Sequence, residues 1–291
     1  MVKIENDKYY TPIDIANHCC DVVYNAIGDK WFNGNPFNPP IIIEPSCGDG
    51  SFFHSDKFRP TIAFDIDLSD EKCFWLKTLS WCCITEGDYL KYDYPITQRN
   101  MDWGSKYLVI GNPPYGSRMN LAQKFFHHST QFADYIAFIL PISQLNNTQS
   151  LYEFDLIYSE DLGIQDYSGR KLHCCFNIYK RPEKGLNSRP KTKLKCIKMV
   201  RNDSKSYKDF KDYDIRMCGW GDGTAGKLLT AEDKEYACEY KIKVTDIPER
   251  DEVIKFFKEY DWNGCVNGIA MKRLKQFHIL NILHKEFPDL D

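Results

Sequence analysis

The sequence predicts an α/β fold with a doubly wound, mostly parallel sheet, followed by a smaller C-terminal domain. Short apolar runs that do not alternate with polar residues recur before residue 180, which is typical of strands buried on both faces of a parallel sheet. Segments able to form helices lie between most of these runs. After Arg181-Pro182 the chain becomes basic and polar, which places a domain boundary near Arg181.

The predicted elements follow in chain order. The first is a helix that begins at Pro12, with Thr11 as its N-cap and Asp14 in its first turn, and ends at Gly28. Strands are predicted over 41–43, 61–64, 82–85, 107–110 and 135–140, with later strands near 154–159 and 173–179. Further helices are predicted over 121–132, 248–260 and about 270–284.

Length and composition exclude several classes of protein. With 291 residues, of which 43% are hydrophobic, the chain can bury a sizeable core, so a disordered or fibrous chain is excluded. No apolar run approaches the roughly 18 residues that a membrane span needs. The polar N-terminus carries no signal-peptide pattern, so we expect a cytoplasmic protein.

The twelve cysteines occur singly or as adjacent pairs, and the sequence holds no C-x-x-C. Adjacent residues of a strand face opposite sides of the sheet, so such pairs form poor disulfide frameworks. We therefore expect reduced, mostly buried thiols and no metal site.

The net charge of −3 hides an uneven distribution. Residues 181–216 hold twelve Lys/Arg and five Asp/Glu, a local charge of +7, which leaves −10 on the rest of the chain. Such asymmetry is typical of a segment that faces a polyanion, although a solvated lysine-rich surface is the alternative. Tyr207 and Phe210 lie among these charges, and we expect them to be buried in the second domain.

A glycine-rich loop, Glu44 to Phe52, directly follows the first predicted strand. Open α/β sheets bind ligands at the carboxyl ends of such strands, and glycine lets a ligand approach the backbone closely. The spacing G-x-G-x-x-F lacks the third glycine of the dinucleotide fingerprint. Asp65, at the end of the second strand, suits two ribose hydroxyls, with an ordinary loop carboxylate as the alternative. Gly87-Asp88-Tyr89 follows the third strand and can offer an acceptor and an aromatic ring to adenine.

Asn112-Pro113-Pro114-Tyr115 immediately follows the fourth predicted strand. The two prolines remove backbone donors and stiffen the turn. The Asn112 side-chain oxygen and the Pro113 carbonyl can then both accept from one planar amino group, while Tyr115 stacks on the ring that bears it. This combination suits an extruded nucleobase.

Together with Tyr9-Tyr10-Thr11-Pro12, these motifs resemble the S-adenosylmethionine-dependent N6-adenine DNA methyltransferases, and their order resembles the gamma class of that family. The resemblance covers about residues 8–180. It implies a Rossmann-like class I methyltransferase fold, with a catalytic domain over 1–180 and a basic target-recognition region with C-terminal helices over 181–291. It also implies a site-specific enzyme that uses S-adenosylmethionine and acts on a flipped adenine in double-stranded DNA.

The resemblance assigns a role to each motif residue. Asn112 and Pro113 would orient the target amine, Tyr115 would stack on the base, and Phe176 would form the opposite wall of the base pocket. The residues expected to hold the cofactor are Tyr10, Thr11, Glu44, Cys47 and Gly48 on the methionine and loop side, Asp65 at the ribose, and Asp88 and Tyr89 at the adenine. The local +7 charge further predicts that Lys191, Lys193 and Lys195 contact DNA phosphates.

The sequence also permits two other interpretations. Asn-Pro-Pro-Tyr also serves methyltransferases that act on protein glutamine or on RNA adenine. A catalytically silent DNA-binding partner belongs to a different class of protein, and cofactor binding would distinguish it. The sequence does not give the recognised DNA site, the role of 219–226, or whether a partner endonuclease or a homodimer exists.

Overall fold

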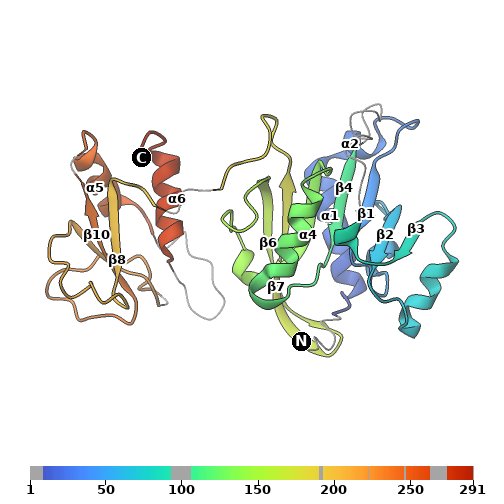
Figure 1. Ribbon diagram of the computed structural model, residues 1–291, viewed down its shortest axis with the longest axis horizontal. Coiled ribbons are helices and arrows are strands. Elements are labelled where there is room, and N and C mark those ends of the chain that lie inside the picture. The colour runs from blue at the N-terminus through green and yellow to red at the C-terminus, as the bar shows by residue number, and fades with distance from the viewer. Residues whose placement is uncertain are drawn as a thin grey trace. The chain divides into compact units, whose positions relative to one another are not determined.

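The computed structural model describes residues 9–92, 106–189, 193–221, 223–245, 247–262 and 274–290. It divides into two compact units, Met1–Arg189 and Pro190–Asp291 (Figure 1). The boundary expected near Arg181 therefore falls inside unit 1. The reason is that Arg181 is bonded to that unit, since its guanidinium donates to the carbonyls of Ala133 at 2.7 Å and Thr130 at 2.5 Å.

Unit 1 is built on a seven-stranded sheet with the order β3-β2-β1-β4-β5-β7-β6. The strands β1 to β5 run parallel, and β7 is antiparallel to both β5 and β6. The chain moves outward from β1 to β3 and then returns to the other side of β1, which creates a switch point between β1 and β4. The strands are β1 (Ile41–Glu44), β2 (Ile62–Asp65), β3 (Cys83–Glu86), β4 (Tyr107–Gly111), β5 (Tyr135–Pro141), β6 (Asp155–Tyr167) and β7 (Arg170–Lys180).

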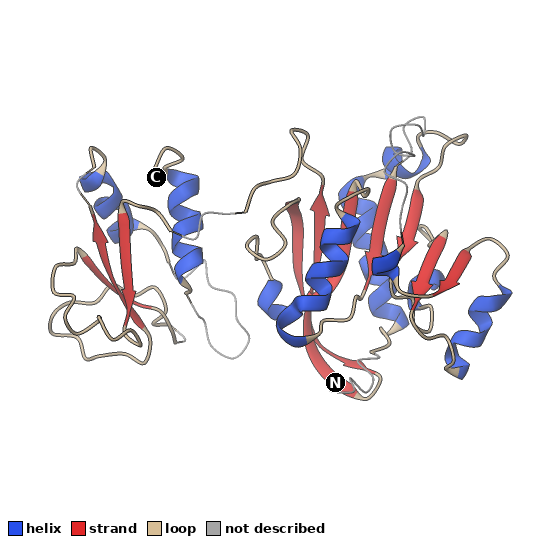
Figure 2. Cartoon of the chain, in the orientation of Figure 1, coloured by secondary structure: helices blue, strands red, loops and turns tan. Residues whose placement is uncertain are grey.

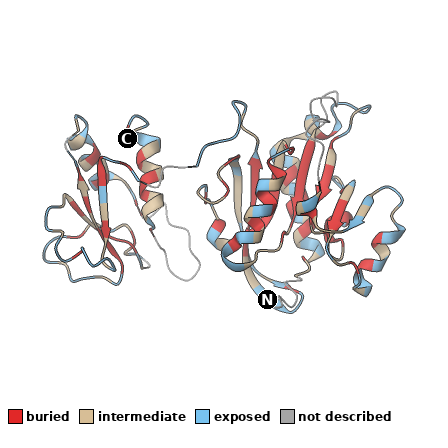
Figure 3. Ribbon diagram, in the orientation of Figure 1, coloured by how far each residue is buried: buried red, intermediate tan, exposed pale blue. Residues whose placement is uncertain are grey.

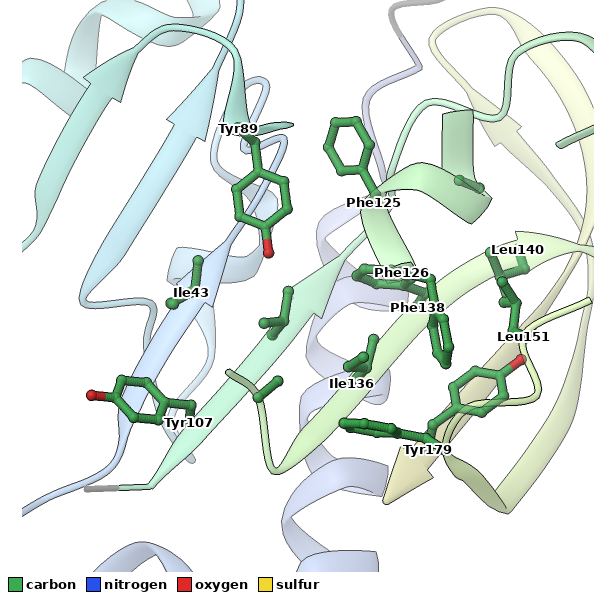
Figure 4. Close-up of a cluster of buried hydrophobic side chains, with 14 of the residues drawn as sticks. Ile43, Tyr89, Tyr107, Phe125, Phe126, Ile136, Phe138, Leu140, Leu151 and Tyr179 are labelled. Carbon is green, nitrogen blue, oxygen red and sulfur yellow. The ribbon is translucent and has the colours of Figure 1, made fainter. Parts of the chain in front are cut away.

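Helices cover both faces of this sheet (Figure 2). The first, α1 (Ile13–Ile27), packs Cys19 and Val23 on the face that includes Leu108. On the opposite face, α4 (Asn120–Ser129) contributes Phe126 to the core cluster that includes Val109. Figure 4 shows Phe126 beside Phe138 in this cluster. Neighbouring strand residues thus enter two different cores, which explains why the strands lack alternation. Strand β4 is buried along its whole length, and β5 is buried except at its two end residues (Figure 3).

The other helices within the described residues of unit 1 are short. They are α2 (Asp29–Asn33) and the 3-10 helices η1 (Ser51–His54), η2 (Glu71–Thr78), η3 (Tyr89–Lys91), η4 (Ser117–Met119) and η5 (Ile142–Gln144).

Two local expectations in unit 1 are corrected. Thr11 does not cap α1: the helix has Pro12 as its N-cap and no side-chain cap bond, because the Thr11 hydroxyl pairs with Asn112 instead. The last two strands are longer than predicted and form one hairpin around Ser168 and Gly169, whose φ angles are 55° and 84°. A two-residue turn with positive φ at both positions matches the twist of the strands, so pairing continues up to the turn.

Unit 2 holds a three-stranded antiparallel sheet with the order β8-β10-β9. Its core joins the sheet to Val253 and Phe257 of one helix and Leu283 of another. Tyr207 is buried, as expected, and its hydroxyl donates to the buried carboxylate of Glu239. The elements are β8 (Ile197–Arg201), β9 (Ile215–Cys218), β10 (Glu239–Val244), α5 (Arg250–Glu259) and α6 (Gln276–Glu286).

The start of the last predicted helix, 270–273, lies outside the described residues. Among the residues that the structure places, no helix combines the length and apolar character needed to cross a membrane.

Candidate active site

A pocket of about 360 Å³ opens at the carboxyl edge of the unit 1 sheet, beside the switch point between β1 and β4. The loops that follow β1, β2, β3 and β4 all contribute to its lining. Tyr9 and Tyr10 at the N-terminal side and Leu121 and Phe125 of α4 complete it. Parallel strands end at the same edge of a sheet, so motifs far apart in the sequence meet here.

The loop after β1 forms one wall of the pocket. Gly48 has a φ of 51°, and its backbone N–H donates to Asp65 Oδ2 at 2.8 Å. A Cβ at Gly48 would lie 3.0 Å from Cδ1 of Tyr10, which is closer than side chains normally pack. Glycine therefore allows the loop to pass directly against the Tyr10 ring.

Asp65 at the end of β2 lines the pocket next to this loop. Its second carboxylate oxygen accepts from the backbone N–H of Asp67 at 3.0 Å. Two backbone donors thus fix the direction of the carboxylate. Ile66 also lines the pocket, although 74% of its surface is exposed, and sequence reasoning missed it. The signal was an apolar residue directly after the strand-end acid, at a position where a ligand can cover it.

The loop after β3 brings two further residues to the pocket. Asp88 accepts from the backbone N–H of Leu90 at 3.0 Å and caps η3. Tyr89 is almost fully buried, with its hydroxyl 2.8 Å from Ser129 Oγ and its ring 5.3 Å from that of Phe125 (Figure 4). Burial raises the pKa of Tyr89, so the phenol stays neutral. Tyr89 acts as a packed wall of the pocket.

The turn after β4 lies opposite, on the other side of the switch point. Ser46 Oγ donates to the backbone carbonyl of Asn112 at 3.1 Å, which joins this turn to the loop after β1. The Tyr115 hydroxyl lies 3.4 Å from Cys174 Sγ of β7. Burial raises the pKa of Tyr115. Asn112, Pro113 and Tyr115 all line the pocket. The contact with Cys174 of β7 holds the hydroxyl end of the Tyr115 ring.

The N-terminal segment crosses the loop after β1. Tyr10 lines the pocket and donates its hydroxyl to Asp70 at 2.6 Å, while its backbone N–H donates to Ser168 Oγ at 3.1 Å. Thr11 is buried and is not among the lining residues. Its hydroxyl accepts from Asn112 Nδ2 at 3.2 Å, so it touches the turn after β4.

Glu44 and Cys47 lie beneath the loop and do not line the pocket. Burial, together with the nearby carboxylates of Asp65 and Asp49, raises the pKa of Glu44 well above its usual range. Glu44 Oε2 is buried without a hydrogen bond to any residue that the structure describes. Burial raises the pKa of the Cys47 thiol. Both groups are therefore held in their neutral forms.

The remaining predictions concern one aromatic residue and three lysines, none of which is among the described residues that line the pocket. Phe176 is fully buried in the core on the α1 side of the sheet and does not line the pocket, so its assignment to a base pocket is corrected. Hydrophobic burial of an aromatic in a central position of β7 explains its presence. Lys193 and Lys195 are exposed in unit 2, and Lys191 lies outside the described residues.

The strand order, with one antiparallel strand in an otherwise parallel core, and the pocket at its switch point define the fold of the class I methyltransferases. The resemblance to methyltransferases is also found by sequence comparison. M.CvrRI, a type II methyltransferase of Paramecium bursaria Chlorella virus XZ-6E, is 26% identical over 169 residues, which cover 51% of this chain and 40% of that protein. The match thus spans less than half of the relative's length. No family model matches the chain.

The solved structures found by comparison are distant in sequence. A Pyrococcus horikoshii protein assigned as an RNA methyltransferase is 14% identical with a TM-score of 0.45, covering 60% of this chain and 87% of that one. Magnesium protoporphyrin IX methyltransferase of Synechocystis PCC 6803, with bound SAM, is 13% identical with a TM-score of 0.38, covering 62% and 88%. The DrdV–DNA complex is 13% identical with a TM-score of 0.40, covering 60% and 26%.

Proposed function

We propose that this protein transfers a methyl group from S-adenosylmethionine to the exocyclic N6 amine of a flipped adenine in double-stranded DNA. The observation that carries the proposal is the lining of a single pocket. Asp65 and Asp88 line it from one half of the sheet, and Asn112 to Tyr115 line it from the other. A nucleoside-binding half and an amine-binding half therefore face the same cavity.

The first half suits the cofactor, and its fit rests on three features. The Asp65 carboxylate is aimed by two backbone N–H groups and can accept from ribose hydroxyls. Exposed Ile66 can pack on a purine ring, and Asp88 can accept from the amino group of that ring. Gly48 lines the pocket, and its lack of a Cβ lets the Tyr10 ring pack against the loop. When bound, S-adenosylmethionine supplies an electrophilic methyl group on a sulfonium centre.

The second half suits the target amine. The nitrogen of an aromatic amine is a poor nucleophile because its lone pair is conjugated with the ring. Asn112 Oδ1 and the Pro113 carbonyl would accept hydrogen bonds from its two N–H groups and favour a tetrahedral nitrogen with a free lone pair. Tyr115 would stack on the base, since its hydroxyl is held near Cys174 and its ring is fixed. Positioning and hydrogen bonding supply this catalysis.

Unit 2 would provide the contact with DNA. Lys193 and Lys195 are exposed, and Lys198 Nζ lies 4.8 Å from the centre of the half-buried Phe210 ring. Exposed ammonium groups in an otherwise acidic protein suit the phosphates of a duplex. Tyr207 is buried and hydrogen-bonded, so it stabilises unit 2 and does not stack on bases.

The test compares acceptors directly. The purified chain is incubated with methyl-labelled S-adenosylmethionine and, separately, with unmethylated duplex DNA, RNA and protein, and the products are hydrolysed and analysed by mass spectrometry. N6-methyladenine from DNA supports the proposal. Label only in RNA adenine or protein glutamine would replace it with the corresponding alternative. Absence of both methyl transfer and cofactor binding would favour the catalytically silent DNA-binding partner.

A second measurement addresses the recognised site and the partners. Sequencing with modified-base detection after expression in a methylation-free host would reveal the methylated sequence. A partner endonuclease or a homodimer would appear as an increase in mass when the chain is purified from its source or sized in solution.

A further inference from the structure

We infer that Arg118, in the turn between β4 and α4, binds a phosphate of the DNA strand that carries the target adenine. The inference rests on the proposed function, because it names the contact that brings this strand to the amine-binding half of the pocket. Arg118 lies three residues after Tyr115 and three before Leu121, and both of those residues line the pocket. The turn that carries Arg118 is therefore part of the rim.

This turn is tightly closed. The Leu121 N–H donates to the Tyr115 carbonyl at 3.2 Å, which joins its two ends. Gly116 has a φ of 65°, and a Cβ there would lie 2.3 Å from Asn120 Oδ1. Glycine is therefore required at this point for the chain to turn so sharply. The close turn holds Arg118 at a fixed place beside the pocket.

The backbone of Arg118 has an unusual conformation. Its φ is 53°, and the φ of Met119 is 66°, both in the left-handed region that residues other than glycine rarely adopt. Met119 is 7% exposed and belongs to the core cluster of α4, so packing explains its place. Arg118 is exposed, and no packing requires its long side chain. A strained residue with an exposed cation beside a candidate active site indicates that the side chain serves the site.

The Arg118 guanidinium is available for a ligand. Among the described residues, none forms a hydrogen bond, an ion pair or a ring contact with it. Other arginines of the chain are engaged: Arg216 Nη2 pairs with Glu239 Oε2 at 2.9 Å, and Arg181 donates to two backbone carbonyls. A guanidinium carries a permanent charge and five donors in a planar fork, which suits the oxygens of a phosphate.

The charges around the pocket favour a phosphate on this side. The segment 107–133 holds no Asp or Glu, and its two cations, Arg118 and Lys124, are both exposed. The opposite half of the pocket is lined by three carboxylates, those of Asp65, Asp67 and Asp88. A polyanion is repelled by the carboxylates and attracted by the cations, so it approaches from the side of the turn.

The geometry of base flipping also places a phosphate at the rim. A base that rotates out of the duplex stays joined to its own sugar and phosphates. When the base enters the pocket and stacks on Tyr115, these phosphates remain at the entrance. Arg118 follows Tyr115 by three residues in the closed turn, so it lies where such a phosphate must pass. A phosphate contact of this kind fixes register and orientation without reading sequence.

The first experiment compares Arg118→Gln with Lys30→Gln, which removes the same charge at the amino edge of the sheet. Lys30 is exposed in α2, and the carbonyl of its neighbour Trp31 accepts from Lys106 Nζ at 3.0 Å, directly before β4. Binding to duplex DNA is titrated by fluorescence anisotropy at several salt concentrations. We expect Arg118→Gln to weaken binding about tenfold and to reduce the salt slope by about one. Lys30→Gln should change DNA affinity less than about twofold, and neither variant should change cofactor affinity more than that.

A second experiment locates the contact. On a duplex that the wild type methylates, the phosphates beside the target adenine are replaced one at a time by neutral methylphosphonates. The wild type should lose about tenfold in affinity at one of these positions, and Arg118→Gln should lose less than about twofold at the same position. Arg118→Gly suits the φ of 53°, so it should bind DNA as weakly as Arg118→Gln and unfold at a temperature no lower than the wild type.

Wild-type affinity and an unchanged salt slope in Arg118→Gln would overturn the inference. Equal losses in Arg118→Gln and Lys30→Gln would overturn it too, as would a variant that stays as sensitive as the wild type at every substituted phosphate. Failure of the proposed function is recognised separately, because it shows in the wild type as absent methyl transfer to DNA, whereas the salt titration needs no transfer. If the wild type methylates RNA adenine, the phosphates of that RNA are substituted, and insensitivity of Arg118→Gln at one position supports the same phosphate contact. Transfer to protein glutamine by a wild type that does not bind DNA would overturn both proposals.

Discussion

The backbone N–H of Gly48 donates to the carboxylate of Asp65, with 2.8 Å between N and Oδ2. This bond ties the glycine loop after β1 to the end of β2, its neighbour in the sheet. Both residues line the pocket, so one wall of the site is held by a contact between two strand ends. A change at either residue should therefore affect cofactor binding.

Gly48→Ala should lower cofactor affinity about tenfold and reduce thermal stability. The φ of 51° costs an alanine roughly 1–2 kcal/mol, and its Cβ would lie 3.0 Å from the Tyr10 ring. Calorimetry and thermal unfolding measure the two effects. Gly185→Ala is the matched control, since Gly185 has a φ of 96° with nothing within 4 Å of an added Cβ. Normal cofactor affinity in Gly48→Ala would remove the loop from the cofactor site.

Asp65→Ala should weaken the cofactor through its ribose. Removing an acceptor of charge-assisted hydrogen bonds costs roughly 1.5–3 kcal/mol, which corresponds to about 10- to 150-fold in affinity. Titration calorimetry with S-adenosylmethionine measures the change, and the 2′-deoxy analogue should lose less affinity in the variant than in the wild type. Unchanged affinity would transfer the ribose role to Asp67, which also lines the pocket.

Asn112→Ala should abolish methyl transfer and keep cofactor binding. The Asn112 side-chain amide donates to Thr11, and the Asn112 backbone carbonyl accepts from Ser46, so neither bond involves the carboxylates expected to hold the cofactor. Single-turnover assays measure transfer, and calorimetry measures cofactor affinity on the same preparation. Retention of more than about a tenth of wild-type turnover would contradict the catalytic role, because a positioned acceptor typically contributes 100- to 1,000-fold.

Replacing three lysines of unit 2 with glutamine should weaken DNA binding and flatten its salt dependence. Each lost phosphate contact should reduce the slope of log affinity against log salt by about one. The variant changes Lys191, Lys193 and Lys195 together. The matched control removes the same charge from exposed lysines of unit 1, namely Lys30, Lys57 and Lys77. Equal effects in both variants would show that the lost net charge, and not contacts made by these three lysines, weakens DNA binding.

Glu44→Gln should stabilise the protein at neutral pH. Burial raises the pKa of Glu44 in the folded state, so folding holds a proton that the unfolded chain releases above about pH 4.5. The wild type should therefore lose stability as pH rises from that value toward the raised pKa, by about 1.4 kcal/mol for each unit of the shift. Unfolding by urea at several pH values measures this. A difference between variant and wild type that does not grow with pH would contradict the neutral state of Glu44.

The positions of the strands along the chain and the motifs at their ends could be predicted from the sequence. Apolar runs such as 107–110 and 135–140 predict strands directly, since a strand with two buried faces requires continuous hydrophobic residues. Because parallel strands end at one edge, Gly48, Asp65 and Asn112 could be expected in one place, and all of them line the pocket.

Other features were decided only by tertiary structure. Thr11 fits a helix cap by local pattern, yet its partner is Asn112. An aromatic residue such as Phe176 can either line a pocket or fill the core, and packing on the α1 side of the sheet buries it in the core. Ile66 is exposed on the pocket, although apolar residues usually signal a core. Periodicity and turn chemistry act over a few neighbouring residues and so can be read from the sequence. The partner of a side chain is chosen by segments that folding brings together, and no local pattern contains that information.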